Sequence, residues 1–270
     1  MGAQKEMSFL SHLEELRWHL VRSAAAIFVL GIVFFAFAEE VYDNFLLAHI
    51  QSDFITYQLF CDFFTFFGFE SDFCNISFVD KKLQSIKVTS QLMNSIWTSF
   101  VLGIIVAFPY ILLEFWKFIS PGLHKSERRQ SRGFISIASL LFFLGVAFSF
   151  YVIAPISINF LYNYQITDAI QNNFTLESHI GLVTNMILGV SMLFELPVII
   201  YFLAKIGIIT PAFLKKYRKH AFVFVLIIAA IITPPDVASQ IIVSIPVLIL
   251  YEISIKVAAI VIKRQQKNAK

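Results

Sequence analysis

Long apolar segments, separated by charged loops, constrain this chain more than any other feature. A membrane-spanning helix needs about 18 residues or more, and four of the segments are that long: 20–38, 92–113, 133–155 and 180–204. Two weaker segments follow: 221–232 is short, and 237–255 contains Pro246 and Glu252. With 58% hydrophobic and 14% charged residues, the chain is too apolar for one soluble core. We therefore predict an all-α integral membrane protein with six transmembrane helices in a single membrane domain, the last two spans being short.

The positions of lysine and arginine predict the orientation. When both termini and the loops at 117–132 and 205–219 are placed on one side, that side holds 18 of the 21 cations. Cytoplasmic loops of membrane proteins carry such an excess, so both termini are expected in the cytoplasm. The net charge of +3 then reflects topology, and no basic groove suggests nucleic acid as a partner. The acidic residues near the N-terminus do not fit a cleavable signal peptide. We expect a multi-pass protein of the bacterial cytoplasmic membrane.

The long loop at 39–91 is expected on the external side and has nine phenylalanines between Phe54 and Phe78. Such a density of aromatic residues beside acids suggests segments that lie on the outer bilayer surface or cap the helix bundle. Both cysteines of the chain, Cys61 and Cys74, are in this loop. In an oxidising space they could form a disulfide, and two free thiols are an equally good interpretation.

Two cytoplasmic segments carry carboxylates among cations. Residues 7–20 have the periodicity of an amphipathic helix that runs into the first span, and Glu15 lies nearly opposite its apolar face. Residues 114–132 turn at Ser-Pro-Gly and hold five lysines or arginines around Glu127. Both glutamates could receive a cationic ligand. Equally, they could form surface ion pairs, which contribute roughly 0–1 kcal/mol and need no function.

Four segments in order resemble the TatC family, the receptor subunits of the twin-arginine protein translocase. These are His-Leu-Glu-Glu-Leu-Arg at 12–17, residues 115–129, Phe-Glu-Leu-Pro-Val at 194–198, and Thr-Pro-Pro-Asp-Val-Ala-Ser-Gln at 233–240. The resemblance implies that Glu15 and Glu127 bind the paired arginines of a signal peptide, with Arg17 and Phe118 in the same patch. It also implies that the last two spans receive the single helix of a TatA- or TatB-type partner, with Thr233 and Gln240 at polar positions of that contact.

Polar residues within the later spans leave alternatives open. Glu195 could be a proton relay, a partner-binding site or a carboxyl satisfied by neighbouring helices, because a carboxylate in the bilayer costs about 2.5–3.5 kcal/mol. Lys256 lies four residues after Glu252, which suggests a local ion pair. Thr233, Asp236 and Gln240 belong to a tight turn between the short spans, and their side chains could simply bond within it.

The resemblance favours a receptor that binds Arg-Arg signal peptides, recruits partner subunits in an oligomeric complex in the lipid bilayer, and exports folded proteins with the proton motive force. We expect no enzyme activity, cofactor or metal site, because the usual catalytic motifs are missing. Two other functions remain open. A proton-coupled transporter of small solutes would use Glu195, although no repeat relates the two halves of the chain as in many transporters. A structural scaffold would need neither Glu15 nor Glu127.

Overall fold

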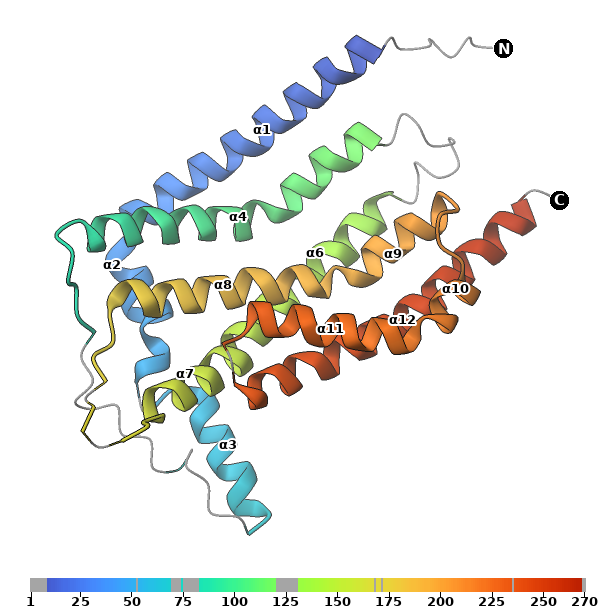
Figure 1. Cartoon of the computed structure of the whole chain (residues 1–270). Coiled ribbons are helices and arrows are strands. Elements are labelled where there is room, and N and C mark those ends of the chain that lie inside the picture. Colours follow the sequence, from blue (N-terminus) through green and yellow to red (C-terminus); the bar gives the residue numbers. More distant parts are fainter. Residues whose placement is uncertain are drawn as a thin grey trace. The chain divides into compact units, whose positions relative to one another are not determined.

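A computed structural model describes residues 9–51, 53–68, 74, 83–119, 131–167, 169–170, 172–234 and 236–268. Within these residues the protein is almost entirely helical (Figure 1). The longer helices are α1 (Phe9–Ala36), α3 (Ile55–Phe66), α4 (Ser90–Ile119), α6 (Ser131–Phe148), α7 (Ala154–Asn163), α8 (Leu176–Phe194), α9 (Leu196–Lys205), α11 (Arg218–Ile232) and α12 (Val237–Asn268). The shorter ones are α2 (Ala38–Val41), α10 (Pro211–Lys216), the π-helices η1 (Tyr42–Leu46) and η5 (Ser149–Ile153), and the 3₁₀-helix η2 (Ala48–Ile50).

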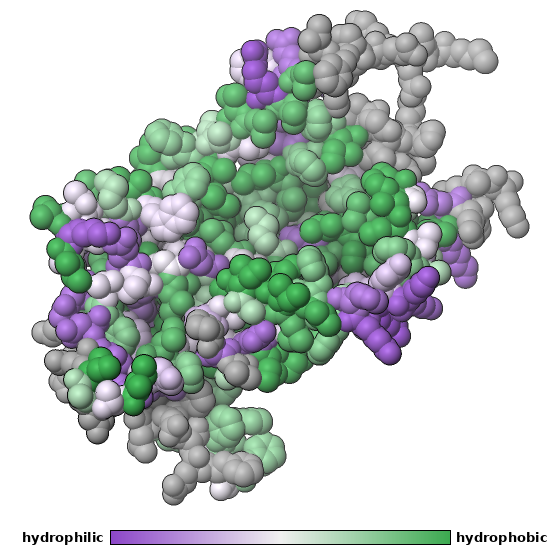
Figure 2. Space-filling view, in the orientation of Figure 1, coloured by the Kyte–Doolittle hydropathy of each residue, from purple (hydrophilic) through white to green (hydrophobic). Residues whose placement is uncertain are grey.

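Five stretches of helix among the described residues are long and apolar enough to cross a bilayer: Leu13–Ala36, Ser90–Ile119, Ile135–Asn163, Leu176–Lys205 and Ala238–Lys263. The predicted fifth span coincides with α11, which has only 15 residues. Hydrophobic side chains cover much of the visible surface (Figure 2), and some of the largest are well exposed, such as Phe28 at 69% and Ile231 at 77%. A surface of this kind suits lipid rather than water as its surroundings.

The chain divides into two compact units, of which the first comprises residues 1–38 and 92–140. In this unit α1 and α4 approach each other closely at two glycines. A Cβ atom on Gly103 would lie 2.7 Å from the carbonyl oxygen of Ile27 and 3.1 Å from the backbone nitrogen of Gly31. Glycine is therefore required at this crossing, because any larger residue would push the two backbones apart.

The second unit comprises residues 39–91 and 141–270. In it η5 joins α6 to α7, so the helix continues through Pro155 and ends at Asn163, beyond the predicted boundary of the span. Pro155 has no backbone N–H, which removes one helical donor for the preceding turn, and its ring also crowds the carbonyl four residues earlier. Two side chains of the external segment donate to carbonyls of this turn. His49 Nε2 lies 2.8 Å from the Phe150 oxygen, and Thr56 Oγ1 donates to the Tyr151 oxygen at 2.6 Å.

Several contacts fasten the external segments in the same unit. Cys61 and Cys74 form a disulfide bond, so of the two interpretations of these cysteines the structure has the paired one. The Tyr57 hydroxyl donates to the His49 oxygen at 2.8 Å. Farther along, the Gln84 backbone bonds to both Phe174 and Leu176 at 2.9 Å, which ties the first external segment to the one before α8.

The fourth predicted span consists of α8 and α9, which meet at Glu195. Pro197 stands in the first turn of α9, where proline is tolerated because the first N–H groups of a helix have no partner within it. Helix α12 packs against α9 and α11, and it continues thirteen residues beyond the predicted boundary at 255. A buried cluster joins α9, α10 and α12 through Ile200, Ala204, Leu214, Tyr251, Ile255, Ala258 and Val261.

Candidate functional site

A buried carboxylate near the ends of α1 and α4 organises the polar part of the first unit. Glu114 on α4 is 1% exposed and receives three basic groups. His19 Nδ1 lies 2.6 Å from Glu114 Oε2, Lys117 Nζ lies 2.6 Å from Oε1, and Arg22 Nη1 lies 3.6 Å from Oε2. Because His19 and Arg22 are on α1, the cluster fixes the register of α1 against α4.

Three of the residues expected to bind a signal peptide lie on these two helices. Glu15 is half-buried on α1, and Arg17 is exposed two residues later. Arg17 makes a 3.5 Å ion pair with Glu14, and its guanidinium lies 5.5 Å from the centre of the Trp18 ring. On α4, the Phe118 ring meets His19 edge to face, with 6.3 Å between ring centres. The contact between Phe118 and His19 joins the same two helices as the Glu114 cluster.

Glu127, the second carboxylate expected in this site, lies outside the described residues. The two-carboxylate arrangement of Glu15 and Glu127 therefore stays a prediction. The structure adds one connection: Glu15 and Phe118 lie on two helices that are joined by a polar cluster around the buried Glu114 carboxylate.

Glu195 lies in the second unit at the junction of α8 and α9. Its side chain is buried, with the residue 6% exposed, and neither carboxylate oxygen has a hydrogen-bond partner among the described residues. Such an unpaired acid in an apolar setting is costly and is expected to find a proton or a partner. The structure thus disfavours the interpretation in which neighbouring helices satisfy this carboxyl.

The turn between α11 and α12 holds the other polar residues singled out by the sequence. The Thr233 hydroxyl donates to the Ala229 oxygen at 2.9 Å, and the Gln240 amide donates to the Leu226 oxygen at 3.1 Å. Asp236 accepts from the Ser239 backbone N–H at 2.6 Å and also bonds the Ser239 hydroxyl, which itself lies 2.6 Å from that of Ser157. Asp236 therefore caps α12, and Ser239 anchors that helix to α7.

Comparison with known proteins identifies the chain's relatives. The family model of "Sec-independent protein translocase protein (TatC)" matches residues 11–246. The chain belongs to the TatC family. It is 40% identical over 262 residues to TatC of Blattabacterium sp. subsp. Periplaneta americana, covering 97% of this chain and 98% of that protein. It is 31% identical over 264 residues to TatCy of Bacillus subtilis, covering 98% and 93% respectively.

Solved structures agree with this assignment. The crystal structure of the twin-arginine translocase receptor TatC superimposes with a TM-score of 0.69 at 31% identity, covering 93% of this chain and 99% of that one. A second crystal structure of that receptor, in the detergent DDM, gives a TM-score of 0.71 and covers 92% and 99%. The predicted all-α membrane fold is thereby confirmed.

TatC membership settles several of the expectations. The chain is a component of a protein translocase and not an enzyme, and it works in a complex with other subunits. It is a multi-pass protein of the bacterial inner membrane. The solute-transporter alternative is not favoured, because the TatC relatives extend over nearly the whole chain.

One predicted ion pair of this TatC chain was wrong. Glu252 pairs with Arg218 at 2.7 Å rather than with Lys256. Sequence spacing favoured the neighbour four residues away on the same helix, whereas the packing of α11 against α12 brings a residue 34 positions away into reach. Local spacing cannot show such a contact.

Sequence reasoning also missed the Glu114 cluster. From sequence, residue 114 is only the first residue of the cytoplasmic segment 114–132, and no motif singles out His19 or Arg22. A signal was present, because a carboxylate at the end of an apolar segment, followed three residues later by lysine, demands a cationic environment. What the sequence could not supply was the α1 partner.

Proposed function

We propose that this TatC chain binds twin-arginine signal peptides at its cytoplasmic face through Glu15 and Glu127, with Arg17 and Phe118 as neighbours in the site. The observation that carries the site assignment is the Glu114 cluster. It joins α1, which carries Glu15, to α4, which ends at Phe118 and Ile119 and leads toward Glu127. A rigid connection there would hold one carboxylate at a defined distance from the loop that carries the other.

The chemistry of the ligand fits two carboxylates. A guanidinium presents a planar fork of donors that matches a carboxylate with two parallel hydrogen bonds, whereas an ammonium offers a point charge. Two separated carboxylates can therefore distinguish Arg-Arg from Lys-Lys by geometry as well as by charge. Arg17, whose guanidinium rests beside Glu14 and Trp18, is placed to order the surface next to Glu15.

The test is a binding measurement with purified protein in lipid nanodiscs and labelled peptides that carry Arg-Arg or Lys-Lys. Removing one charge-assisted pair costs about 1.5–3 kcal/mol, so Glu15→Gln and Glu127→Gln should each weaken Arg-Arg binding by ten-fold or more. The preference over Lys-Lys should shrink in both variants. Glu39→Gln, at an exposed glutamate of α2 that has no part in the proposed site, is the control and should keep both affinities. Equal binding by all three variants would remove Glu15 and Glu127 from the site.

Recruitment of TatA- or TatB-type subunits with single membrane helices is the second part of the proposal, followed by export of folded proteins with the proton motive force. The α11–α12 turn and Glu195 are the candidate contacts. Glu195 has an unpaired carboxyl that could bond a polar side chain of an incoming helix. Thr233 and Gln240 already donate to carbonyls of α11, so their part would be to hold the hairpin in shape for the partner.

A further inference from the structure

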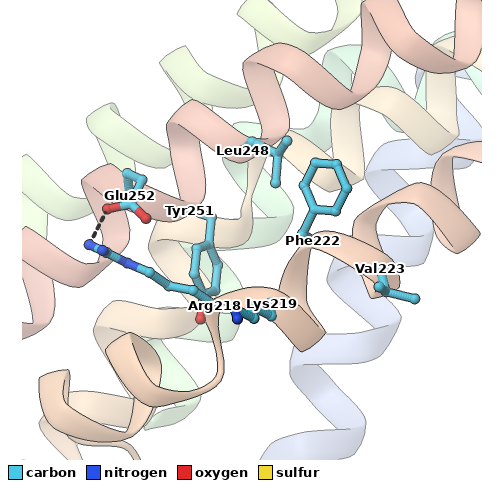
Figure 3. A pocket seen from close by; sticks show the side chains of 7 residues that line it. All are labelled: Arg218, Lys219, Phe222, Val223, Leu248, Tyr251 and Glu252. Atoms are coloured by element: carbon cyan, nitrogen blue, oxygen red, sulfur yellow. Dashed lines mark hydrogen bonds and ion pairs between the residues drawn. The ribbon is translucent and has the colours of Figure 1, made fainter.

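A pocket of about 500 Å³ opens between the first turns of α11 and the middle of α12 (Figure 3). Its polar side is made by Arg218, Lys219 and Glu252, and its apolar side by Phe222, Val223 and Leu248. In the close view the Phe222 and Leu248 side chains point toward one another, while Arg218 and Glu252 are joined by their ion pair. The pocket thus has charge on one side and hydrocarbon on the other.

The length of α11 determines the depth of this pocket in the bilayer. At about 1.5 Å per residue, a helix of 15 residues spans about 22 Å, whereas a bilayer's hydrocarbon core is about 30 Å thick. Arg218 and Lys219 are the first two residues of this short helix. Their charges therefore lie at the edge of the hydrocarbon core or slightly inside it. A span this short is accommodated by a locally thinner bilayer, by snorkelling of its flanking cations or by association with a partner.

The charges of the pocket are suited to one phosphodiester. Arg218, Lys219 and Glu252 carry a formal net charge of +1. Glu252 engages the Arg218 Nη2 atom at 2.7 Å and leaves the other donors of the guanidinium available. Lys219 is exposed and makes no ion pair within the described part of the chain. Both basic groups line the same pocket and keep donors for an anion that enters it.

We propose that this pocket binds a phospholipid of the cytoplasmic leaflet, with its phosphate on Arg218 and Lys219. The first part of an acyl chain lies against Phe222, Val223 and Leu248. Val223 is 54% exposed and Phe222 46%, so the chain has apolar surface to follow as it leaves the pocket. The lipid fills the space that the short helix leaves at the cytoplasmic boundary. This site is separate from the signal-peptide site and does not depend on it.

The occupant is a lipid rather than a partner helix because the pocket pairs two cations with an apolar wall at headgroup depth. A single-span helix would have to bring its own anion to that depth, whereas a phospholipid has phosphate and chain in the required order. The charge pattern decides between the two classes of ligand.

Native mass spectrometry of the full-length protein in detergent tests the proposal, with phosphatidylglycerol as the probe. Lys219→Gln should weaken phosphatidylglycerol binding about fivefold, because one Lys or Arg near a lipid headgroup strengthens binding by about that factor. Lys215→Gln removes another exposed cation that does not line the pocket, and should leave binding unchanged. An equal loss in both variants would show a diffuse basic surface and overturn the proposal.

The apolar half of the site has its own pair of variants. Val223→Trp should fill the pocket and lower lipid occupancy, whereas Ile227→Trp, on the same helix and 53% exposed, should not. Diacylglycerol with the same chains should bind poorly, and so should glycerol phosphate without chains. If glycerol phosphate binds as tightly as the lipid, the pocket is a site for soluble anions and the proposal fails.

A photo-crosslinking residue at position 223, used in native membranes, separates lipid from protein occupants. Lipid adducts that disappear in the Lys219→Gln background are expected. Adducts to protein alone would show that a partner helix occupies the pocket and would overturn the lipid assignment. Unchanged thermal unfolding of each variant in detergent serves as the folding control.

Discussion

At the scale of a residue, Glu114 shows how much one side chain contributes to the stability of the fold. Its carboxylate is buried, but Arg22 and Lys117 are about half exposed, so solvent screens part of the attraction. We expect Glu114→Gln to lower the free energy of unfolding by about 1–3 kcal/mol, because Arg22 and Lys117 then lack their counter-charge. Chemical or thermal unfolding in detergent measures this.

Glu14→Gln is the matched control for Glu114→Gln. Glu14 and Arg17 also lie three residues apart, but their side chains are 66% and 65% exposed, and such a pair contributes about 0–1 kcal/mol. If Glu114→Gln were no more destabilising than Glu14→Gln, the cluster would not hold α1 to α4. Signal-peptide affinity should also fall in Glu114→Gln, although residue 114 is not proposed to touch the peptide.

His49 makes the stability of the external segment depend on pH. Burial lowers the pKa of His49 from 6.5 to about 4, and nearby His179 lowers it further, against the opposing hydrogen bond to Phe150. Between these values the unfolded chain binds a proton that the folded chain does not. The free energy of unfolding therefore falls as the pH falls from about 6.5 to 4, by about 3 kcal/mol in total.

Unfolding measured across this pH range checks the contribution of His49. In His49→Gln the fall in stability should be smaller, because the amide can still donate to the Phe150 oxygen without titrating. His220→Gln, at an exposed position, should keep the slope of the unaltered protein. An identical slope in His49→Gln would mean that other groups cause the dependence.

The contact between α1 and α4 is the clearest case at the scale of an element. In Gly103→Ala the new methyl group would overlap the α1 backbone, which should cost about 1–3 kcal/mol. In Gly133→Ala nothing lies within 4 Å, so the better helix propensity of alanine should stabilise by up to about 1 kcal/mol. Thermal unfolding of the two variants should therefore shift in opposite directions. A shift of Gly103→Ala in the same direction would show that α1 and α4 can separate without loss.

Apolar segments predicted the helices well, but their ends less so. The third span extends past Pro155 because donors from elsewhere in the chain compensate the missing N–H. These donors lie far away in sequence, so the residues around Pro155 do not predict them. The sixth helix extends past 255 because a helix can leave the membrane without breaking. Local sequence shows where a chain is apolar, whereas a helix ends where its hydrogen bonds do.

At the scale of the whole molecule, ordered motifs identified the family, and packing supplied the rest. Glu15 and Arg17 belong to one short segment and could be selected from the sequence, as could Glu195. The Glu114 cluster and the Arg218–Glu252 pair could not, because each depends on two helices meeting in one register. Residues that act through a distant partner are the ones that a single sequence conceals.

Partner recruitment is a prediction at this scale, since it needs the assembled hairpin. Replacing Thr233 and Gln240 together with leucine removes two donors to α11 and should weaken co-purification of the single-span subunits. Signal-peptide binding should be retained, because its proposed residues lie on α1, on α4 and in the loop after α4. Loss of both activities together would indicate a folding defect. Asn163→Leu, at a polar position elsewhere in the second unit, serves as the control for substitution as such.

The two donors that serve the carbonyls before Pro155 also constrain how this protein can diverge. His49 and Thr56 bond to main-chain oxygens, so these two hydrogen bonds place no demand on the side chains at 150 and 151. A lineage that replaced Pro155 with a residue carrying an N–H would give one of these carbonyls a helical donor, and so relax the need for a side-chain donor at 49 or 56. We therefore expect these three positions to change together in evolution.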